Sequence, residues 1–377
     1  MKVLFLSTES NRAQTRSAYG HRLDKLRLAI EAQGFESDEF SLRDARVRRP
    51  ILLHPLNYPE AREKLLRADF IHAGGDAAYV AKMWSPFLSA KIIHDVHGDT
   101  FNEARFKWMH QRSLSAMHQM IQSYIANFVE FRKSGRFLVV SRPMQNWLNN
   151  RCKGSLDNSA LIRNGVDLNV FRPLPGSNNS KFVVGYAGGF VGWQGVGNLV
   201  KAVSQTTNQN IELHLIGLQS SDRKLASEFK SQLGDRLQLF DRMSQGELVK
   251  TLAHTDVLAI PRQSHPALRV ALPTKFAEYL AIGKPVIVSN VDETADLINQ
   301  YKCGLVAEPS IESWSQTLDD AAQLSLREKK EMGVRGRELA ESEFAWDRIG
   351  DNYAHWLHRW SASSLTQKPR TPESVSV

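Results

Sequence analysis

The segment LPTKFAEYLAIGKPVIVSN, residues Leu272–Asn290, predicts a loop, a short helix, a glycine stop and a buried strand in succession. Pro273 suits the first turn of the helix, because its φ is fixed and its missing N–H would have no partner there. Phe276 and Leu280 give the helix an apolar side, and Gly283 is placed to end it. The β-branched run PVIVS is typical of a strand that is covered on both faces. The segment therefore predicts an α/β arrangement.

Two polar side chains of the same helix are not needed for its packing. Lys275 and Glu278 are three residues apart and share one helix face. A lysine near a helix N-terminus suits a phosphate group, and a carboxylate suits the two hydroxyls of a ribose. The alternative is a surface helix with one ion pair, which would contribute only about 0.2–0.5 kcal/mol.

Two stretches of the chain resemble one known family. The pattern P-x-K-x-x-E-Y-x-A-x-G-K-P-V within Leu272–Asn290 resembles the donor-binding motif of family 4 glycosyltransferases, which are retaining enzymes with the GT-B fold. LIRNGVDLNVFRP, Leu161–Pro173, is similar to the interdomain signature of that family. The resemblance implies two Rossmann-like domains that face each other across a cleft. It also implies that Lys275 binds the donor phosphates and Glu278 the ribose.

Length and composition agree with a protein of two globular domains. The chain has 377 residues, of which 42% are hydrophobic and 23% are charged. The N-terminal stretch MKVLFLSTES reads as a strand rather than a signal peptide, and no apolar run is long enough to span a bilayer. Cys152 and Cys303 are too few for a disulfide framework or a zinc site. These features predict a cytoplasmic protein, with the inner face of the membrane as an alternative location.

The net charge of +8 favours an anionic partner. Nothing in the sequence resembles a nucleic-acid-binding module, so nucleic acid is not expected as a partner. Nucleotide sugars and acidic lipid headgroups fit the charge equally well. The charge is therefore compatible with peripheral contact with an anionic membrane.

Alternating strands and helices predict two parallel sheets. Expected strands of the first series cover 2–7, 35–40, 69–73, 91–95 and 137–141, with helices at 21–33 and 106–133; core packing is the favoured role of 106–133. Expected strands of the second series start at 182, 211, 237, 256, 285 and 304. The predicted domains are 1–172 and 173–344, and the resemblance implies that a helix within 345–362 crosses back to the first. Residues 363–377 are predicted to be disordered.

A glycine-rich turn, YAGGFVGWQGVG, follows the first strand of the second series. Gly188 and Gly189 would let a pyrophosphate approach the backbone near a helix N-terminus. Members of the family commonly carry an arginine and a lysine on this loop, and the corresponding places here are Gly189 and Gln194. Phosphate binding is therefore expected from Lys275, backbone amides and Arg269.

A second departure concerns the paired glutamates of the family. The first of them would lie eight positions before Glu278, where this chain has Val270. Without that carboxylate, we expect main-chain groups of the RVALPTK loop to hold part of the donor sugar.

The segment IIHDVHGDTFNE, Ile92–Glu103, places polar residues after a strand of the first domain. His97 resembles the strand-end histidine of the family, which contacts the transferred sugar. Asp99 and Glu103 would orient the acceptor or the histidine, or else be solvated loop charges. A metal site formed by His94, His97 and Asp99 is less favoured, because side chains alternate faces in an extended segment.

The loop after the first strand, SNRAQTRSAYGH, is basic. Gly20 resembles a family glycine near the donor phosphates, and Arg12, Arg16 and His21 would meet the acceptor or the donor. The alternative is a basic surface loop. Ser141 is predicted to cap the helix that follows it rather than to take part in catalysis.

These features predict a retaining, metal-independent glycosyltransferase that needs no cofactor. It would move a hexose-type sugar from a nucleotide-sugar donor to a glycan, a lipid-linked acceptor or a small molecule, with His97 and Lys275 as the catalytic residues. Two alternatives remain. A non-catalytic GT-B subunit is favoured by the missing glutamate, arginine and lysine, and a nucleotide-sugar epimerase by the two-domain layout.

Overall fold

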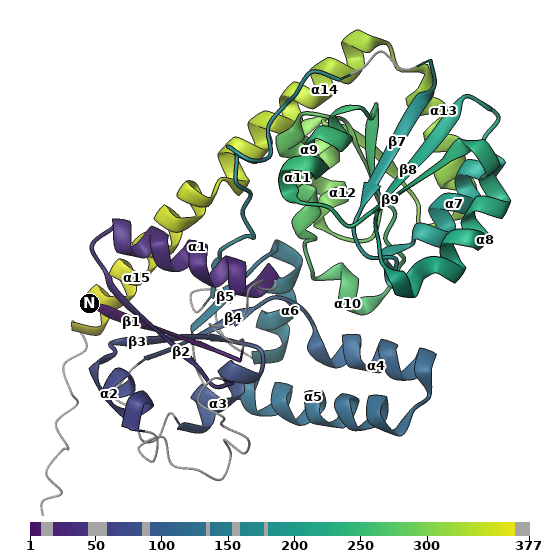
Figure 1. Cartoon of the computed structure of the whole chain (residues 1–377). Helices are drawn as coiled ribbons and strands as arrows, with labels where there is room; N and C mark the ends of the chain where they lie inside the picture. The colour runs from purple at the N-terminus through teal and green to yellow at the C-terminus, as the bar shows by residue number, and fades with distance from the viewer. Residues whose placement is uncertain are drawn as a thin grey trace, which may run out of the picture.

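The computed structural model describes residues 1–8, 18–43, 59–84, 91–132, 136–152, 159–176 and 180–365. It has two lobes, each built on a parallel sheet of six strands (Figure 1). The strand orders are β2-β1-β3-β4-β5-β6 and β12-β11-β10-β7-β8-β9. The predicted α/β fold with two Rossmann-like domains is confirmed. Arg12, Arg16 and residues 366–377 lie outside the described residues.

The first lobe carries the N-terminal βα series. Its strands are β1 (Lys2–Ser7), β2 (Glu36–Ser41), β3 (Phe70–Gly74), β4 (Lys91–Val96), β5 (Arg136–Val139) and β6 (Ser159–Leu161). Its helices are α1 (Ala18–Ala32), α2 (Pro59–Arg67), α3 (Asp76–Trp84), α4 (Thr100–Gln111), α5 (Leu114–Arg132) and α6 (Arg142–Cys152).

Alternation along β1 divides the core of this lobe into two layers. Val3 and Phe5 pack with α1 on one face of the sheet, and Leu4 and Leu6 pack with α2 and α3 on the other. Because both faces are covered by helices, the strand is apolar at nearly every position.

The second lobe repeats this construction. Its strands are β7 (Phe182–Ala187), β8 (Ile211–Leu218), β9 (Leu237–Asp241), β10 (Val257–Ile260), β11 (Val286–Ser289) and β12 (Gly304–Ala307). Its helices are α7 (Val196–Gln205), α8 (Arg223–Leu233), α9 (Gln245–Ala253), α10 (Pro266–Arg269), α11 (Thr274–Ile282), α12 (Glu293–Tyr301), α13 (Ile311–Gln323) and α14 (Leu326–Leu339), with short 3-10 turns at 192–194, 220–222 and 234–236. Gly283 ends α11 with φ +74°, as the sequence predicts.

The C-terminal helix α15 (Trp346–Leu365) lies against the first lobe. A π-helical turn, Ala340–Phe344, leads into it from α14, and Figure 1 shows α15 beside α1. Tyr353 and Leu357 belong to the same core cluster as β1. At the crossing, the N–H of Val166 donates to the carbonyl of Phe344 over 2.8 Å. Assignment of the domain boundaries at 172/173 and 344/345 stays a prediction.

Two sequence predictions about helices need correction. The stretch 106–133 is not one helix but contains the end of α4 and the whole of α5, because Arg112 takes the left-handed conformation (φ 47°) and ends α4. The last helix continues to Leu365, beyond the predicted limit at 362. Within the described residues, none of the helices combines the length and the apolarity that crossing a bilayer requires.

Candidate functional site

The turn after β7 brings a glycine backbone close to Lys275. Gly188 has φ +141°, a conformation that side-chain-bearing residues rarely adopt, and a Cβ there would lie 2.6 Å from the Lys275 ammonium. Gly189 follows, and a Cβ on it would meet no atom within 4 Å. The open space beside Gly189 and the ammonium beside Gly188 therefore adjoin the same turn.

Lys275 has only neutral hydrogen-bond partners in the described structure. Its ammonium donates to the hydroxyl of Tyr186 over 3.0 Å and to the side-chain oxygen of Gln194 over 3.2 Å. It also lies 4.2 Å from the centroid of the Tyr186 ring. Burial lowers the pKa of Lys275 to about 7, with repulsion from Arg262 adding to the effect and Glu278 opposing it. A bound anion would supply the negative charge that this ammonium lacks.

Glu278 lies on the same helix as Lys275, but the two described side chains do not form the ion pair that a surface helix would show, since the ammonium of Lys275 donates to Tyr186 and Gln194 instead. Burial raises the pKa of Glu278, and the nearby Lys275 partly offsets this shift. The neighbouring Tyr279 accepts a hydrogen bond from the N–H of Ala187 over 2.7 Å. This bond ties α11 to the end of β7, so both polar residues of α11 are placed beside the glycine turn.

Arg262 is the cation near Lys275 that sequence reasoning missed. The predicted candidate, Arg269, is exposed at the end of α10. Arg262 is buried, contacts the carboxylate of Asp292, and donates to the carbonyl of Ala271 over 2.9 Å. The available signal was its position directly after the apolar strand DVLAIP, since ligands of parallel sheets bind at the carboxyl ends of strands.

Val270, where the family places its first glutamate, is an interdomain contact. It is buried within a cluster of first-lobe residues that includes Val96, Val139 and Met144. Ser141 donates a hydrogen bond of 2.5 Å to the Val270 carbonyl and accepts one from the N–H of Met144. Ser141 thus caps α6, as the sequence predicts, and also joins the lobes.

In the first lobe, His97 lies at the end of β4 next to a buried carboxylate. Its Nε2 atom is 3.3 Å from Oδ2 of Asp95, which also receives two hydrogen bonds of 3.0 Å from Arg22 and contacts His72. Burial would raise the pKa of Asp95, but Arg22, together with His97 and His72, outweighs it and holds the pKa well below its usual value. The carboxylate therefore stays charged and restrains the His97 ring.

Gly20 lies in the first turn of α1, in the same lobe as His97. The adjacent Tyr19 ring is 4.5 Å from the His97 ring, edge to face. Gly74 allows this arrangement, because a Cβ on it would lie 2.4 Å from the Tyr19 hydroxyl. His97 is consequently held between Tyr19 and Asp95.

Asp99 and Glu103 take different roles. Asp99 is buried and caps α4, accepting a hydrogen bond of 3.1 Å from the N–H of Asn102. Glu103 lines a cavity of about 920 Å³ together with His97, Lys107, Asn127 and Trp193. Burial raises the pKa of Glu103, and the nearby Asp99 adds to the shift while Arg262 opposes it.

The proposed metal ligands do not form a metal site. Within the described residues, no three histidine, cysteine or acidic side chains are grouped in a way that could hold an ion. His94 is buried on the inner strand β4, and Asp99 is engaged in capping α4. The set His94, His97 and Asp99 is therefore not assembled.

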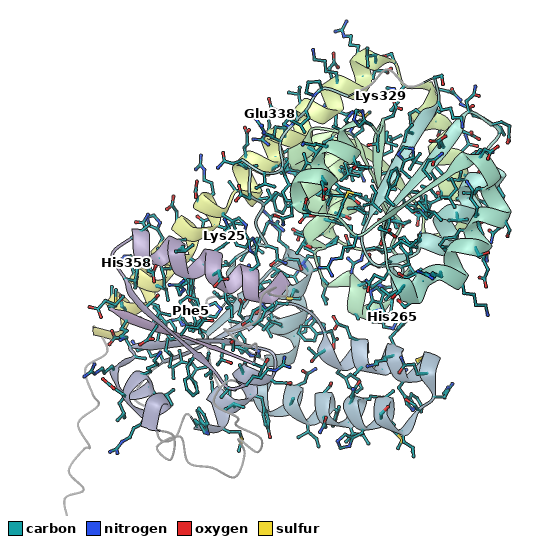
Figure 2. The ribbon with its side chains drawn as sticks, in the orientation of Figure 1. Phe5, Lys25, His265, Lys329, Glu338 and His358 are labelled. Carbon is teal, nitrogen blue, oxygen red and sulfur yellow. The ribbon has the colours of Figure 1, made fainter. Side chains whose placement is uncertain are left out.

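Two further side-chain contacts join the lobes, and the second of them involves Trp193, which lines this cavity. Arg163 donates two hydrogen bonds, of 2.9 and 2.8 Å, to Glu293, and both side chains are buried. Phe106 on α4 packs against the ring of Trp193 at 5.7 Å and against His265 at 4.6 Å. Figure 2 shows His265 on the side of the second lobe that faces α4. Because Trp193 precedes Gln194, the cavity beside His97 and the surroundings of Lys275 meet at one turn.

Two family models match the chain in succession. Residues 20–170 match the model described as Glycosyltransferase Family 4, and residues 170–339 match the model described as Glycosyl transferases group 1. No curated protein matches the sequence significantly.

Solved structures of similar fold cover almost the whole chain. Sucrose-phosphate synthase from Thermosynechococcus elongatus is 17% identical with a TM-score of 0.77, covering 96% of this chain and 99% of its own. A glycosyltransferase from Rickettsia africae is 16% identical with a TM-score of 0.73, and the match covers 97% of this chain and 99% of the Rickettsia chain. HepE from Anabaena, in complex with UDP, is 16% identical with a TM-score of 0.69, and the match covers 95% of this chain and 100% of the HepE chain. At these identities the likeness shows the fold.

Proposed function

Because the chain is a glycosyltransferase of the GT-B fold, we propose that it transfers a hexose-type sugar from a nucleotide-sugar donor, with retention of the anomeric configuration. The observation that carries the proposal is the ammonium of Lys275, which has neutral partners only and adjoins the open glycine turn at Gly189. That is an arrangement suited to a diphosphate. HepE, which shares the fold, is known in complex with UDP and with UDP-glucose.

The donor would bind on the second lobe. Lys275 would hold the diphosphate together with the backbone at Gly188 and Gly189, and Glu278 would accept hydrogen bonds from the ribose. Arg262 adds positive charge at the end of β10, and we assign to it the phosphate-binding role that the sequence predicted for Arg269. This second buried cation supports phosphate binding in a chain that lacks the arginine and lysine common on the glycine-rich loop of the family.

The acceptor would bind in the cavity beside His97. The proposed acceptor is a glycan, a lipid-linked saccharide or a small molecule, and Glu103 lines the same cavity. In the reaction, the bond between the sugar C1 and the donor phosphate oxygen breaks, and a bond from C1 to the acceptor oxygen forms on the same face. The acceptor proton passes to the departing phosphate, so that no enzyme nucleophile is needed. The protein positions the reactants and stabilises the charge on the leaving group.

We propose that this reaction needs no metal ion and no cofactor, because Lys275 and Arg262 supply the positive charge that the departing diphosphate requires. The cytoplasm remains the proposed location. A non-catalytic GT-B subunit is the second candidate, and one observation favours it: Val270 replaces a sugar-binding carboxylate by an apolar contact between the lobes.

The test is a thermal-shift panel of UDP, GDP, ADP and their hexose conjugates on the wild type and on Glu278→Ala. One nucleotide should raise the melting temperature, and the effect should be lost in Glu278→Ala. Glu338→Ala is the matched control, since Glu338 is an exposed helical carboxylate on the outer side of α14 (Figure 2). Overlapping curves for every ligand would overturn the donor site. Binding without hydrolysis or transfer of the sugar would favour the non-catalytic subunit.

A further inference from the structure

A buried chain of three polar side chains runs from the C-terminal helix to the residue beside His97. The ring of His72, on β3, contacts the Tyr353 hydroxyl through Nδ1 over 2.8 Å and Oδ2 of Asp95 through Nε2 over 3.0 Å. All three side chains are completely buried. The same Oδ2 atom lies 3.3 Å from Nε2 of His97. Tyr353 on α15, 281 positions after His72, is therefore connected to His97 through two intervening side chains.

The chemistry of the three groups fixes the direction of both hydrogen bonds. Against the effect of burial, Arg22 holds the pKa of Asp95 well below its usual value, so the carboxylate is charged and only accepts. Burial lowers the pKa of His72, and the hydrogen bond to Asp95 opposes this shift without cancelling it, so the ring is neutral and carries one hydrogen. That hydrogen must lie on Nε2, and Nδ1 must accept from Tyr353. The hydroxyl stays protonated, because burial raises the pKa of Tyr353 well above its usual value.

The charge of Asp95 does not require His72. Arg22 already donates to both carboxylate oxygens of Asp95, each over 3.0 Å, and neutralises the charge. A neutral imidazole adds no charge to this pair, and its burial removes a polar ring from water at a cost in free energy. What His72 adds is a second restraint on Oδ2, the oxygen that faces His97.

The His72 ring is itself held in one orientation. It stacks on the Phe5 ring at 4.9 Å with an interplanar angle of 27°, and the Tyr353 ring meets it edge to face at 5.6 Å. Tyr353 is fixed in turn, since α15 lies beside α1 (Figure 1) and Tyr353 belongs to the core cluster of the first lobe. The Nε2–H of His72 therefore has a fixed direction toward Oδ2 of Asp95.

We propose that His72 and Tyr353 are positioning residues, which act through Asp95 to fix the tautomer and the orientation of the His97 ring. With Oδ2 held beside it, the neutral His97 ring carries its hydrogen on Nε2, and Nδ1 keeps its lone pair. By this route α15 belongs to the transfer site, although none of the described residues that line the cavity lies on it. The effect on sugar transfer rests on the proposed function, whereas the state of the ring does not.

The test is the double substitution His72→Phe/Tyr353→Phe. It replaces two bonded polar groups by apolar rings of similar shape and leaves Asp95 its bonds to Arg22, so the fold should be kept. Nitrogen-15 spectra of the histidine rings, with the His97 signals assigned by their absence in His97→Ala, should show a changed ratio of the two His97 tautomers. The turnover of sugar transfer should fall about tenfold, while KM for the donor stays within about twofold.

Two variants separate positioning from a general loss of structure. His72→Gln restores a neutral N–H toward the Asp95 carboxylate and an oxygen that accepts from the tyrosine hydroxyl, so it should keep most of the turnover and the wild-type ring signals. His214→Phe is the matched control, since His214 contacts the carboxylate of Glu212 over 2.7 Å in the second lobe. It should leave both readouts unchanged. Circular dichroism and the melting temperature establish that each variant is folded.

His97 ring signals that stay unchanged in the double variant would overturn the proposal, whatever happens to the turnover. Changed ring signals with an unchanged turnover would support the positioning role and would remove His97 from the mechanism under the proposed function. A loss of turnover that is equally large in His72→Gln would assign the effect to packing and would overturn the proposal. Tyr353→Phe, which deletes one hydroxyl, is read in the same way if the double variant does not fold.

Discussion

The ammonium of Lys275 lies 3.2 Å from the side-chain oxygen of Gln194, a residue 81 positions earlier in the chain. The pairing joins the start of α11 to the turn that precedes α7, the two segments that we propose hold the donor phosphates. Neither this oxygen nor the Tyr186 hydroxyl carries a formal charge, so the buried ammonium is solvated by neutral groups only. The proposed donor site therefore gives the ammonium no charged hydrogen-bond partner.

Replacing Lys275 with alanine should lower the turnover of sugar transfer by at least about 100-fold, the scale of losing one charge-stabilising donor. The reason is that charge develops on the departing diphosphate next to this ammonium. Steady-state kinetics with the nucleotide sugar found in the thermal-shift panel provide the measurement. Lys201→Ala, on an exposed position of α7, is the control. Turnover of Lys275→Ala within a few-fold of the wild type would remove Lys275 from the mechanism.

Nucleotide affinity should depend on pH through Lys275. Its pKa in the free protein is lowered to about 7, and a bound diphosphate stabilises the protonated form. The dissociation constant should therefore be constant below neutral pH and should rise as the pH increases through 7. Isothermal titration across this range tests the effect. Lys275→Arg, which stays charged, should bind with a flat profile, and an unchanged slope in that variant would assign the titration to another group.

Two glycine-to-alanine substitutions distinguish an effect on nucleotide affinity from an effect on the stability of the fold. Gly189→Ala places a methyl group in open space, so the fold should be unchanged, but the diphosphate could no longer approach the backbone. We expect nucleotide affinity to fall by about tenfold or more without a loss of melting temperature. Gly246→Ala on α9, which also meets no atom within 4 Å, should change neither quantity. A normal affinity in Gly189→Ala would place the diphosphate elsewhere.

The buried pair Arg163–Glu293 should couple the stability of the two lobes. Removing one partner leaves the other charge buried, so Arg163→Met or Glu293→Gln should each cost about 3–5 kcal/mol of unfolding free energy. The double variant should lose clearly less than the sum. Urea unfolding followed by tryptophan fluorescence measures these values. The exposed pair Arg327–Glu331 is the control and should contribute about 0–1 kcal/mol; additive losses at Arg163 and Glu293 would contradict the coupling.

Asp95→Asn should destabilise the first lobe and free the His97 ring. The substitution leaves the guanidinium of Arg22 buried without its carboxylate, at a cost of about 3–5 kcal/mol. Because the pKa of Asp95 is depressed in the folded state, its stabilisation is present above the unfolded-state pKa and is lost as the pH falls through the folded value. Acid unfolding should therefore begin at higher pH in Asp95→Asn. Asp241→Asn, an exposed aspartate at the end of β9, should unfold like the wild type.

Strand and helix positions of the second lobe were predictable because local patterns agree there. The run PVIVS, the capping glycine Gly283 and the alternation of strands with amphipathic helices all indicate the same fold. The break between α4 and α5 was not predicted, since Arg112 adopts a left-handed conformation without the glycine that usually marks one. Ser113, which accepts a hydrogen bond of 3.2 Å from the N–H of Ala116, was the overlooked signal of a new helix start.

The candidate site was predictable only in part. Lys275, Glu278, Gly188 and Gly189 could be predicted as site residues because their motifs are contiguous in the sequence, and the structure brings the Lys275 ammonium beside Gly188. Arg262 and Tyr186 were missed, since their relation to Lys275 depends on which strands become neighbours in the sheet. Nothing local indicated that Val270 would pack into the first lobe.

By itself, the sequence determined two βα series, the apolar strands and the contiguous residues of the donor motif, because periodicity and glycine placement are properties of short segments. Tertiary structure alone decided that Gln194 meets Lys275, that Asp95 lies beside His97 and that Val270 packs into the first lobe. These relations depend on how the strands of each sheet are ordered and on how the two lobes are packed. Contacts of this kind are selected by the free energy of the whole chain, which no short segment contains.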